Sequence, residues 1–212
     1  VNDGGDHIAI GALTRHRDVE ISDLVNADVP LLSATTRHVG DPQVRHRGTI
    51  GGSIAHGDPA SDIPAALLAM NATMVAKGPD GDRSIAADDF FSGFLETALT
   101  DGEILTEIRI PKHTGVGYSF QKFNRRAQDW AIVGVAAVHG NGMAGVGLVN
   151  MDARPIRAAA VEAALGEGAS AADAAAQAAE GVSPSSDLNA SAEYRQHLAR
   201  VLTRRALEEA AG

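Results

Sequence analysis

The sequence contains no cysteine among its 212 residues. Within this chain, that absence excludes disulfide bonds, thiolate metal sites, iron–sulfur ligation and a cysteine nucleophile. It is consistent with a reducing compartment, and we expect the protein to be cytoplasmic. The eight histidines do not replace thiolates, because no two of them have the i, i+4 spacing of a zinc-binding helix. We therefore expect no metal site.

Positive charge and long apolar runs are also scarce. Lysine occurs only at Lys77, Lys112 and Lys122, and the formal net charge is −9. A nucleic-acid surface needs a basic stripe, so we expect no nucleic-acid partner. No apolar stretch approaches the length that spans a bilayer, and no G-x-S-x-G elbow supports hydrolase chemistry. We interpret the Arg-His-Arg triplets at 15–17 and 45–47 as solvated loops, although an arginine beside a glycine pair could face an anion.

The first half of the chain shows strand patterns separated by short helical ones. Residues 7–11 predict a strand, with Asp3-Gly4-Gly5 as the turn of a hairpin whose first strand is missing. Residues 103–111 alternate apolar and polar side chains and predict a strand that ends at Pro111. We expect further strands at 72–77 and 83–85 and helices at 14–20, at 24–39 and from Pro59 with Asp58 as N-cap.

The second half changes in composition. Three strands are predicted at 118–123, 131–139 and 143–150, with a hairpin turn at Gly140-Asn141-Gly142. Beyond residue 155 the chain is rich in alanine, which favours helices through its intrinsic propensity. We expect these helices near 155–165, 170–180 and 190–209.

One stretch, RGTIGGSIAHGDPASD at 47–62, combines a basic residue, two glycines and an acidic helix start. Gly51 and Gly52 would allow a ligand close to the backbone and leave successive N–H groups free for an anion, although a plain tight turn is an equally valid interpretation. The stretch is neither a P-loop nor a G-x-G-x-x-G motif. Asp62 could accept hydrogen bonds from a polyol or could simply favour the helix N-terminus.

Two further side chains have two interpretations each. Lys122 lies in a predicted strand between Phe120 and Phe123, where it could reach a cofactor or point into solvent. Trp130, the single tryptophan, could stack on a ring or belong to the core.

Taken together, four stretches resemble the FAD-binding medium subunit of the molybdenum hydroxylases, the family of xanthine dehydrogenase and aerobic carbon monoxide dehydrogenase. They are IAIGALTRHRDVE (8–20), HVGDPQVRHRGTIGGSIAHGDPASDIPAALLAMNATM (38–74), DFFSGFLETALTDGEILTEIRIP (89–111) and FQKFNRRAQDWAIVGVAAV (120–138). The order and spacing match along the whole chain, and the sequences of these stretches most resemble the carbon monoxide dehydrogenase medium subunit.

The resemblance implies an α+β fold of the vanillyl-alcohol-oxidase (PCMH) type. Residues 1–113 would form the second lobe of the FAD-binding domain. Residues 114–212 would form the C-terminal flavoprotein domain, with a three-stranded antiparallel sheet at 117–150 and a helical bundle at 155–210. The family's other FAD loop, a Gly-Gly-x-Ser pattern, lies in an N-terminal lobe, so we expect this chain to be truncated at its N-terminus.

The resemblance also implies which residues contact FAD. The backbone at Thr49, Ile50, Gly51, Gly52 and Ser53 would bind the pyrophosphate, and Ser53 departs from the asparagine or aspartate that the family often has there. The other implied contacts are Asp62 to cofactor hydroxyls, Leu105 beside the isoalloxazine, Lys122 to FAD and Trp130 near one flavin face. No catalytic side chain is implied.

The function implied is electron transfer. The FAD of this subunit would take electrons from [2Fe–2S] clusters of a small partner subunit and pass them to an external acceptor. A large partner subunit would hold the molybdenum cofactor, in a dimer of heterotrimers that could associate with a membrane. Alternatives are a subunit of a xanthine- or aldehyde-type dehydrogenase, a free-standing flavin oxidoreductase, or a scaffold of the same fold that has lost FAD.

Overall fold

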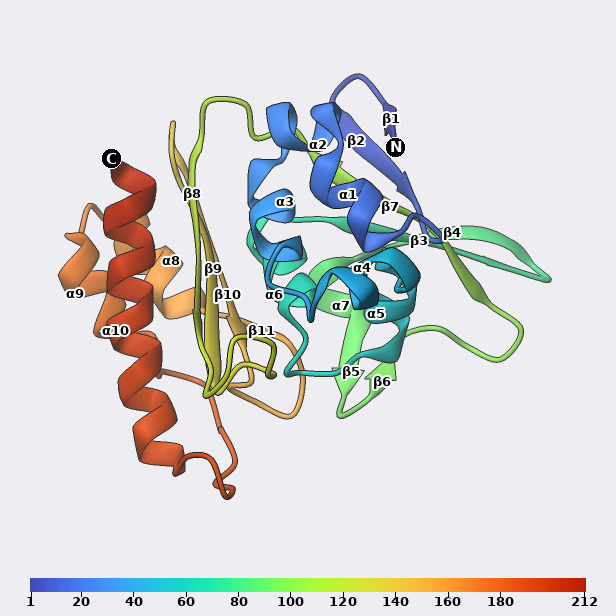
Figure 1. The fold of residues 1–212 in the computed structure, drawn as a ribbon. Coiled ribbons are helices and arrows are strands. Elements are labelled where there is room, and N and C mark those ends of the chain that lie inside the picture. Colours follow the sequence, from blue (N-terminus) through green and yellow to red (C-terminus); the bar gives the residue numbers. More distant parts are fainter.

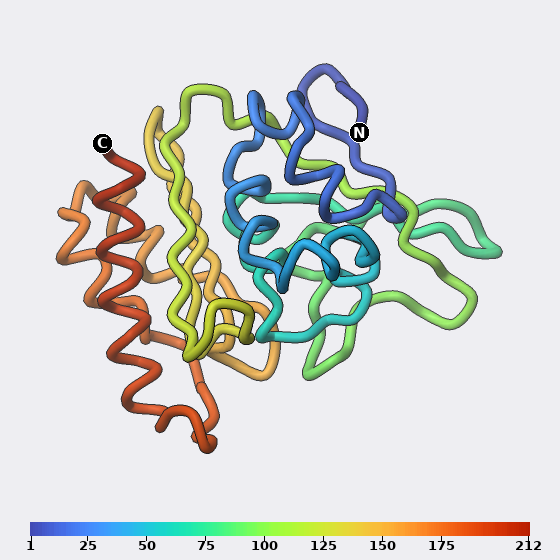
Figure 2. The backbone as a smooth tube through the Cα atoms, viewed as in Figure 1, coloured from blue at the N-terminus to red at the C-terminus, as the bar shows by residue number.

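Two antiparallel sheets lie on either side of one buried helix in the computed structural model, which describes residues 1–212 (Figure 1). The first sheet has the order β1-β2-β7-β3-β4 and the second β11-β10-β9-β8. The N-terminus lies beside the first sheet, and the C-terminus ends the long helix α10 on the far side of the second (Figure 2). The α+β fold class is therefore confirmed.

The first sheet contains the strands predicted around the Gly78–Asp82 turn. Its strands are β1 Asn2–Asp3, β2 His7–Gly11, β3 Thr73–Gly78, β4 Gly81–Ala86 and β7 Ile104–Pro111. The expectation of a missing first hairpin strand is wrong, because Asn2 pairs with Ala9 and Asp3 with Ile8. A short hairpin of β5 Phe91–Gly93 and β6 Glu96–Thr97 stands apart from this sheet.

Seven short helices connect and cover the strands of the first half. They are α1 His16–Ile21, α2 Asp23–Asp28, α3 Pro30–Thr36, α4 Pro42–Arg47, α5 Ile50–His56, α6 Asp62–Ala69 and α7 Ala87–Phe90. The single helix predicted over 24–39 is wrong. Pro30 disfavours a helical conformation of Val29 and starts a new helix at its own first position, so α2 and α3 are separate.

The quoted glycine stretch also folds differently from its prediction. Gly51 and Gly52 do not form a tight loop turn. They lie at the start of helix α5, and Thr49 is its N-cap. The predicted helix start at Asp58-Pro59 is wrong as well. Asp58 accepts a hydrogen bond from the Ala60 N–H at 2.8 Å and closes a turn, and α6 begins only at Asp62.

The second sheet has one strand more than predicted. Strands β8 Gly117–Phe123, β9 Val133–Gly140 and β10 Met143–Val149 are joined by β11 Ile156–Arg157, which pairs with β10. The helix predicted from 155 therefore starts later, and the three helices are α8 Ala159–Gly166, α9 Ala171–Ala175 and α10 Ala192–Ala211. Arg157 is held on this strand by ion pairs to Asp88 and Glu162.

Helix α6 is the element that joins the two sheets. All its side chains are buried, including that of Asp62 at its first position, so no side of the helix faces solvent. Two glycines of β10 make the contact possible, because a Cβ at Gly145 or Gly147 would overlap the carbonyl oxygens of Ala69 and Ala65. The division into domains at 1–113 and 114–212 stays a prediction.

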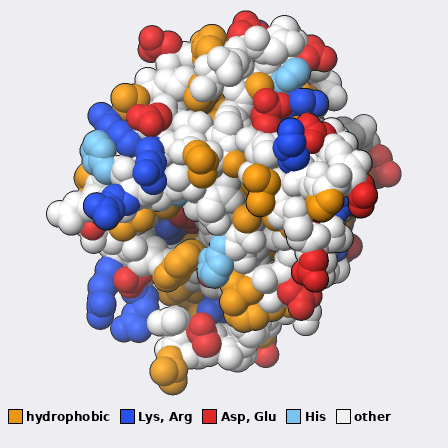
Figure 3. All heavy atoms as spheres, turned by 90° about the vertical axis from the view of Figure 1, so that its right-hand side faces the viewer, with side chains coloured by type: hydrophobic (Ala, Val, Ile, Leu, Met, Phe, Trp, Pro, Cys, Tyr) orange, Lys and Arg blue, Asp and Glu red, His pale blue; other side chains and the backbone are white.

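Apolar side chains also lie on the surface. The most exposed large ones are Leu13, Phe94, Ile104, Trp130 and Leu188. One face carries apolar groups at its centre, with basic side chains gathered mostly along one edge (Figure 3). None of the helices combines the length and the apolar character that a membrane crossing requires.

Candidate functional site

Helix α5 satisfies the N–H groups of its first turn within the protein. The Thr49 hydroxyl accepts from the Gly52 N–H at 3.1 Å, and the Thr49 carbonyl accepts from Ser53. The N–H groups of Ile50 and Gly51 donate to the carbonyls of Thr14 and Ala12, each at 2.9 Å. The expectation of free successive N–H groups is therefore wrong for this conformation.

The predicted residues of α5 divide into two sets. Ile50 and Gly51 are buried and face the segment that follows β2, where a Cβ at Gly51 would lie 2.5 Å from that of Ala12. Thr49, Gly52 and Ser53 instead line a cavity of about 410 Å³, which we call the α5 rim. The other residues that line the rim are Arg15, Arg47, Gly48 and His56.

The α5 rim is cationic. Arg15 and Arg47 are exposed, and neither has a carboxylate within ion-pair distance. The Arg15 guanidinium donates to the Arg47 carbonyl, so the two basic triplets meet across the rim. Unpaired guanidinium groups beside a helix N-terminus favour an anion such as a diphosphate.

His16 supports the rim from below. It is 2% exposed, and its Nε2 lies 2.9 Å from the Ser53 hydroxyl. Burial, followed by the positive charge of Arg45, lowers the pKa of His16 to about 4, so the ring is neutral near pH 7. The neutral ring holds the Ser53 hydroxyl in place. Sequence reasoning missed His16, because the triplet around it is typical of a solvated loop.

A second cavity, which we call the inner cavity, adjoins the rim and has a volume of about 330 Å³. Four predicted residues line it together: Ser53, Asp62, Lys122 and Trp130. They come from α5, α6, β8 and the loop after β8. The structure thus brings together side chains separated by up to 77 positions in the chain.

A buried ion pair forms the wall of the inner cavity. Lys122 Nζ lies 2.7 Å from Asp62 Oδ2, and both side chains are 6% exposed. Lys122 also donates to the His38 carbonyl at 3.0 Å. Burial raises the pKa of Asp62 to about 6 against the opposing effect of Lys122. The second oxygen, Asp62 Oδ1, is buried without any hydrogen-bond partner.

Trp130 and Leu105 have different positions. Trp130 is 62% exposed at the mouth of the inner cavity, so the interpretation as a core residue is wrong. Leu105 is half-buried on β7, packs against the buried core between the first sheet and α6, and lines neither the rim nor the inner cavity. The solvent-directed interpretation of Lys122 is also wrong, since its amine is buried against Asp62.

These two cavities fit FAD. The rim supplies unpaired cations for a diphosphate, and Asp62 Oδ1 supplies a buried acceptor that lacks a donor. Lys122 supplies a buried donor, and Trp130 an exposed ring beside them. An orphaned buried acceptor is costly in isolation, so its partner is expected to come from a ligand or water.

Comparison with known proteins places the chain in a family. Residues 1–113 match the family described as FAD binding domain in molybdopterin dehydrogenase, and residues 118–210 match the CO dehydrogenase flavoprotein C-terminal domain. The chain therefore belongs to the FAD-binding medium subunits of the molybdenum hydroxylases, a family of oxidoreductases. The predicted family and the FAD cofactor are confirmed.

Similar proteins include medium chains of several enzymes. The glyceraldehyde dehydrogenase medium chain of Sulfolobus acidocaldarius is 38% identical, over 96% of this chain and 76% of the relative. The carbon monoxide dehydrogenase medium chain of Hydrogenophaga pseudoflava is 37% identical, over 99% of this chain and 77% of the relative. A solved structure of carbon monoxide dehydrogenase from that organism superposes with a TM-score of 0.94 at 39% identity, covering 99% of this chain and 77% of the other.

Proposed function

We propose that the chain is the FAD-carrying electron-transfer subunit of an aerobic carbon monoxide dehydrogenase in the cytoplasm. Its partners would be a large molybdenum-cofactor subunit and a small subunit with [2Fe–2S] clusters, in a dimer of heterotrimers. The 37% identity to a carbon monoxide dehydrogenase medium chain over 99% of this chain supports the proposal. The lack of cysteine is in keeping with it, because clusters ligated by cysteine must then lie in another chain.

The observation that carries the flavin site is the buried Lys122–Asp62 pair, with its orphaned Oδ1, under the exposed ring of Trp130. Bound FAD would supply a ring that accepts and releases electrons. Asp62 would accept from a cofactor hydroxyl, Lys122 would donate to the ligand, and Trp130 would border one face of the ring.

The remaining predicted residues take different parts in this proposal. Thr49, Gly52 and Ser53 would contact the diphosphate together with the rim arginines. Ile50 and Gly51 would act through the backbone bonds that hold α5 on the segment after β2, and Leu105 would act through packing. The proposal keeps the domain division at residues 113 and 114.

The identity of the substrate is tested on the native complex, which is purified from the source organism through an affinity tag on this chain. We expect flavin, molybdenum and iron to co-purify, and carbon monoxide to bleach the flavin absorption band under anaerobic conditions. Bleaching by glyceraldehyde instead would assign the complex to the aldehyde-type alternative, which the 38% identity to a glyceraldehyde dehydrogenase medium chain favours. A complex without flavin absorption would leave only the scaffold alternative.

The diphosphate site is tested by Gly52→Val. Gly52 is exposed on the rim, and a side chain there would occupy the space that a close ligand needs. We expect the variant to fold and to lose flavin through purification. Flavin retention equal to wild type would refute the role of Gly52.

A further inference from the structure

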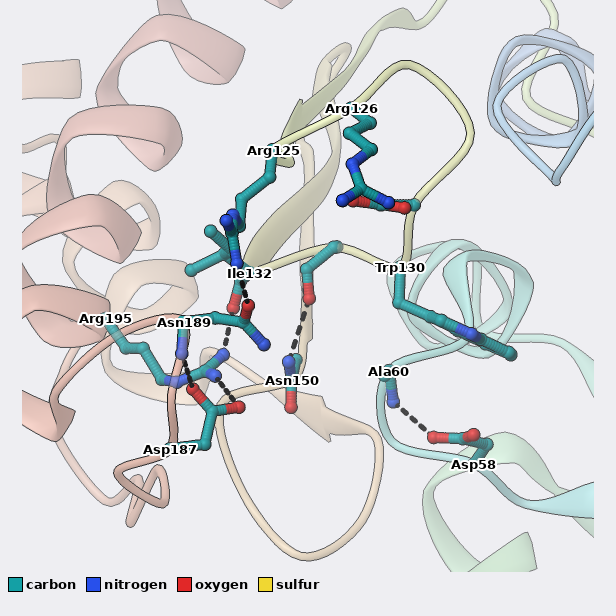
Figure 4. Close-up of a pocket in the computed structure, with 12 residues that line it drawn as sticks. Asp58, Ala60, Arg125, Arg126, Trp130, Ile132, Asn150, Asp187, Asn189 and Arg195 are labelled. Carbon is teal, nitrogen blue, oxygen red and sulfur yellow. Dashed lines mark hydrogen bonds and ion pairs between the residues drawn. The ribbon is translucent and has the colours of Figure 1, made fainter.

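We propose that a third cavity, on the other side of the Trp130 loop, binds a flat aromatic molecule that carries a phosphate or carboxylate group. This cavity, here the arginine cavity, has a volume of about 540 Å³, within the range of small-molecule sites (Figure 4). The lining residues that matter here are Arg125, Asp129, Trp130, Asp187, Asn189 and Arg195.

Arg195 of α10 supplies a buried cation to this cavity. Its side chain is only 2% exposed, and it donates to the Ile132 carbonyl and to Asp187 Oδ2, the latter at 2.7 Å. Its third donor, Nε, is buried without any partner. A buried charged N–H without an acceptor is rare and costly, so its acceptor is expected to come from a ligand or a water molecule.

The other two arginines are not neutralised. Arg125 donates to the neutral Asn189 side chain at 3.0 Å, and neither Arg125 nor Arg126 has a carboxylate within ion-pair distance. Two of the three lining carboxylates are already bound. Asp58 closes the turn at Ala60, and Asp187 accepts from the Asn189 and Ala190 N–H groups as well as from Arg195.

The cavity therefore has two chemically different ends (Figure 4). Arg125, Arg195 and Asn189 gather at one end, and Trp130 lies at the other. The remaining carboxylate, Asp129, precedes Trp130 in the chain and has no cation partner. Its charge repels an anion at the tryptophan end, so an anionic group is favoured at the arginine end. The exposed indole offers a flat apolar surface for a ring. A ligand with a ring and one anionic group matches this division.

The arginine cavity adjoins the proposed flavin site and overlaps it only at the loop that carries Trp130. Asp129 and Trp130 are the residues that line both it and the inner cavity, and it shares none with the α5 rim. The inference therefore does not depend on bound FAD, and it can be tested on the chain with or without flavin.

Trp130 provides the readout, because it is the single tryptophan of the chain. The full chain is titrated with phenyl phosphate, benzoate, inorganic phosphate and phenol, and the emission of Trp130 is corrected against free tryptophan. We expect saturable binding of phenyl phosphate or benzoate, and the stronger of the two identifies the anionic group. Inorganic phosphate and phenol should each bind at least about tenfold more weakly, since each fills one end only.

Matched arginine variants locate the binding. Arg125→Gln, at an exposed position, should weaken binding of the preferred ring anion about tenfold. Arg204→Gln, on an exposed arginine of α10 outside the cavity, should leave it unchanged. Wild-type affinity for the ring anion in both the Arg125→Gln and the Arg126→Gln variant would overturn the proposal. So would a loss caused by Arg15→Gln, because the ligand would then occupy the α5 rim.

Flavin retention is measured on the same samples. Arg125→Gln should keep the flavin content of the wild type while it loses ring-anion affinity. A purified complex without flavin, in which this chain still binds phenyl phosphate through Arg125, would contradict the proposed function but not this site, so the two failures are distinguishable.

Discussion

The α5 rim and the inner cavity adjoin each other but differ in the exposure and pairing of their charged side chains. On the rim, Arg15 and Arg47 are exposed and unpaired, so their attraction for an anion is screened by salt. In the inner cavity, Lys122 and Asp62 are buried and neutralise each other. In the proposed function the rim would attract the charged ligand and the buried pair would orient it, and the pair joins α6 to β8.

The largest effect is expected from breaking the buried pair. Lys122→Met leaves the Asp62 carboxylate buried without a cation, which should lower the free energy of unfolding by about 3–5 kcal/mol. Urea denaturation followed by circular dichroism measures the loss. Adding Asp62→Leu to this variant should recover much of the stability, because the uncompensated charge is then removed.

An exposed ion pair is the matched control. Lys77 lies 3.8 Å from Asp82 at the β3–β4 turn, with both side chains more than half exposed. Lys77→Met should change the free energy of unfolding by less than about 1 kcal/mol. Similar losses in the two lysine variants would contradict the contrast between buried and exposed charge.

The next effect concerns pH, where the two parts of the site have opposite signs. The pKa of Asp62 rises on folding from 3.8 to about 6, so the native state binds more protons than the unfolded state between these values. Its contribution to stability therefore falls as pH rises through that window, by about 1.4 kcal/mol per unit of pKa difference. The pKa of His16 falls on folding from 6.5 to about 4, so its contribution rises with pH between these values.

Single variants separate these opposing contributions. Relative to wild type, Asp62→Asn should gain stability as pH rises from about 4 to about 6, and His16→Gln should lose it up to about 6.5. Above pH 7 both differences should be constant. Unfolding free energies measured across this range check the signs, and slopes of equal sign would refute the assignment.

The smallest effect compares the two glycines of α5. Gly51→Ala puts a Cβ 2.5 Å from the Ala12 Cβ and 2.6 Å from its carbonyl oxygen, so α5 must shift away from the segment after β2 at a cost of about 1–3 kcal/mol. Gly52→Ala meets only the Thr49 hydroxyl, at 2.9 Å, on an exposed face. It should change stability by less than about 1 kcal/mol, because alanine is the better helix former. Thermal unfolding of both variants decides whether glycine serves packing at 51 and ligand approach at 52.

Local sequence rules were reliable where one strong signal acts alone. The alternating run before Pro111 became β7, and the Gly140-Asn141-Gly142 turn joins β9 and β10. They failed where signals compete. Pro30 divided one apolar run into two helices, and Thr49 capped a helix that two glycines would otherwise weaken. β11 has only two residues, too few for a periodic pattern to reveal.

The sequence by itself determined the family, the local glycine and proline positions, and four residues of the inner cavity, Ser53, Asp62, Lys122 and Trp130. Only the tertiary structure decided that Lys122 and Asp62 neutralise each other and that the N–H groups of α5 are already bonded. It also decided that three arginines of two separate segments surround one cavity. The reason is physical: charge pairing, burial and hydrogen bonding depend on distances between residues far apart in the chain, and these distances exist only once α6 has joined the two sheets.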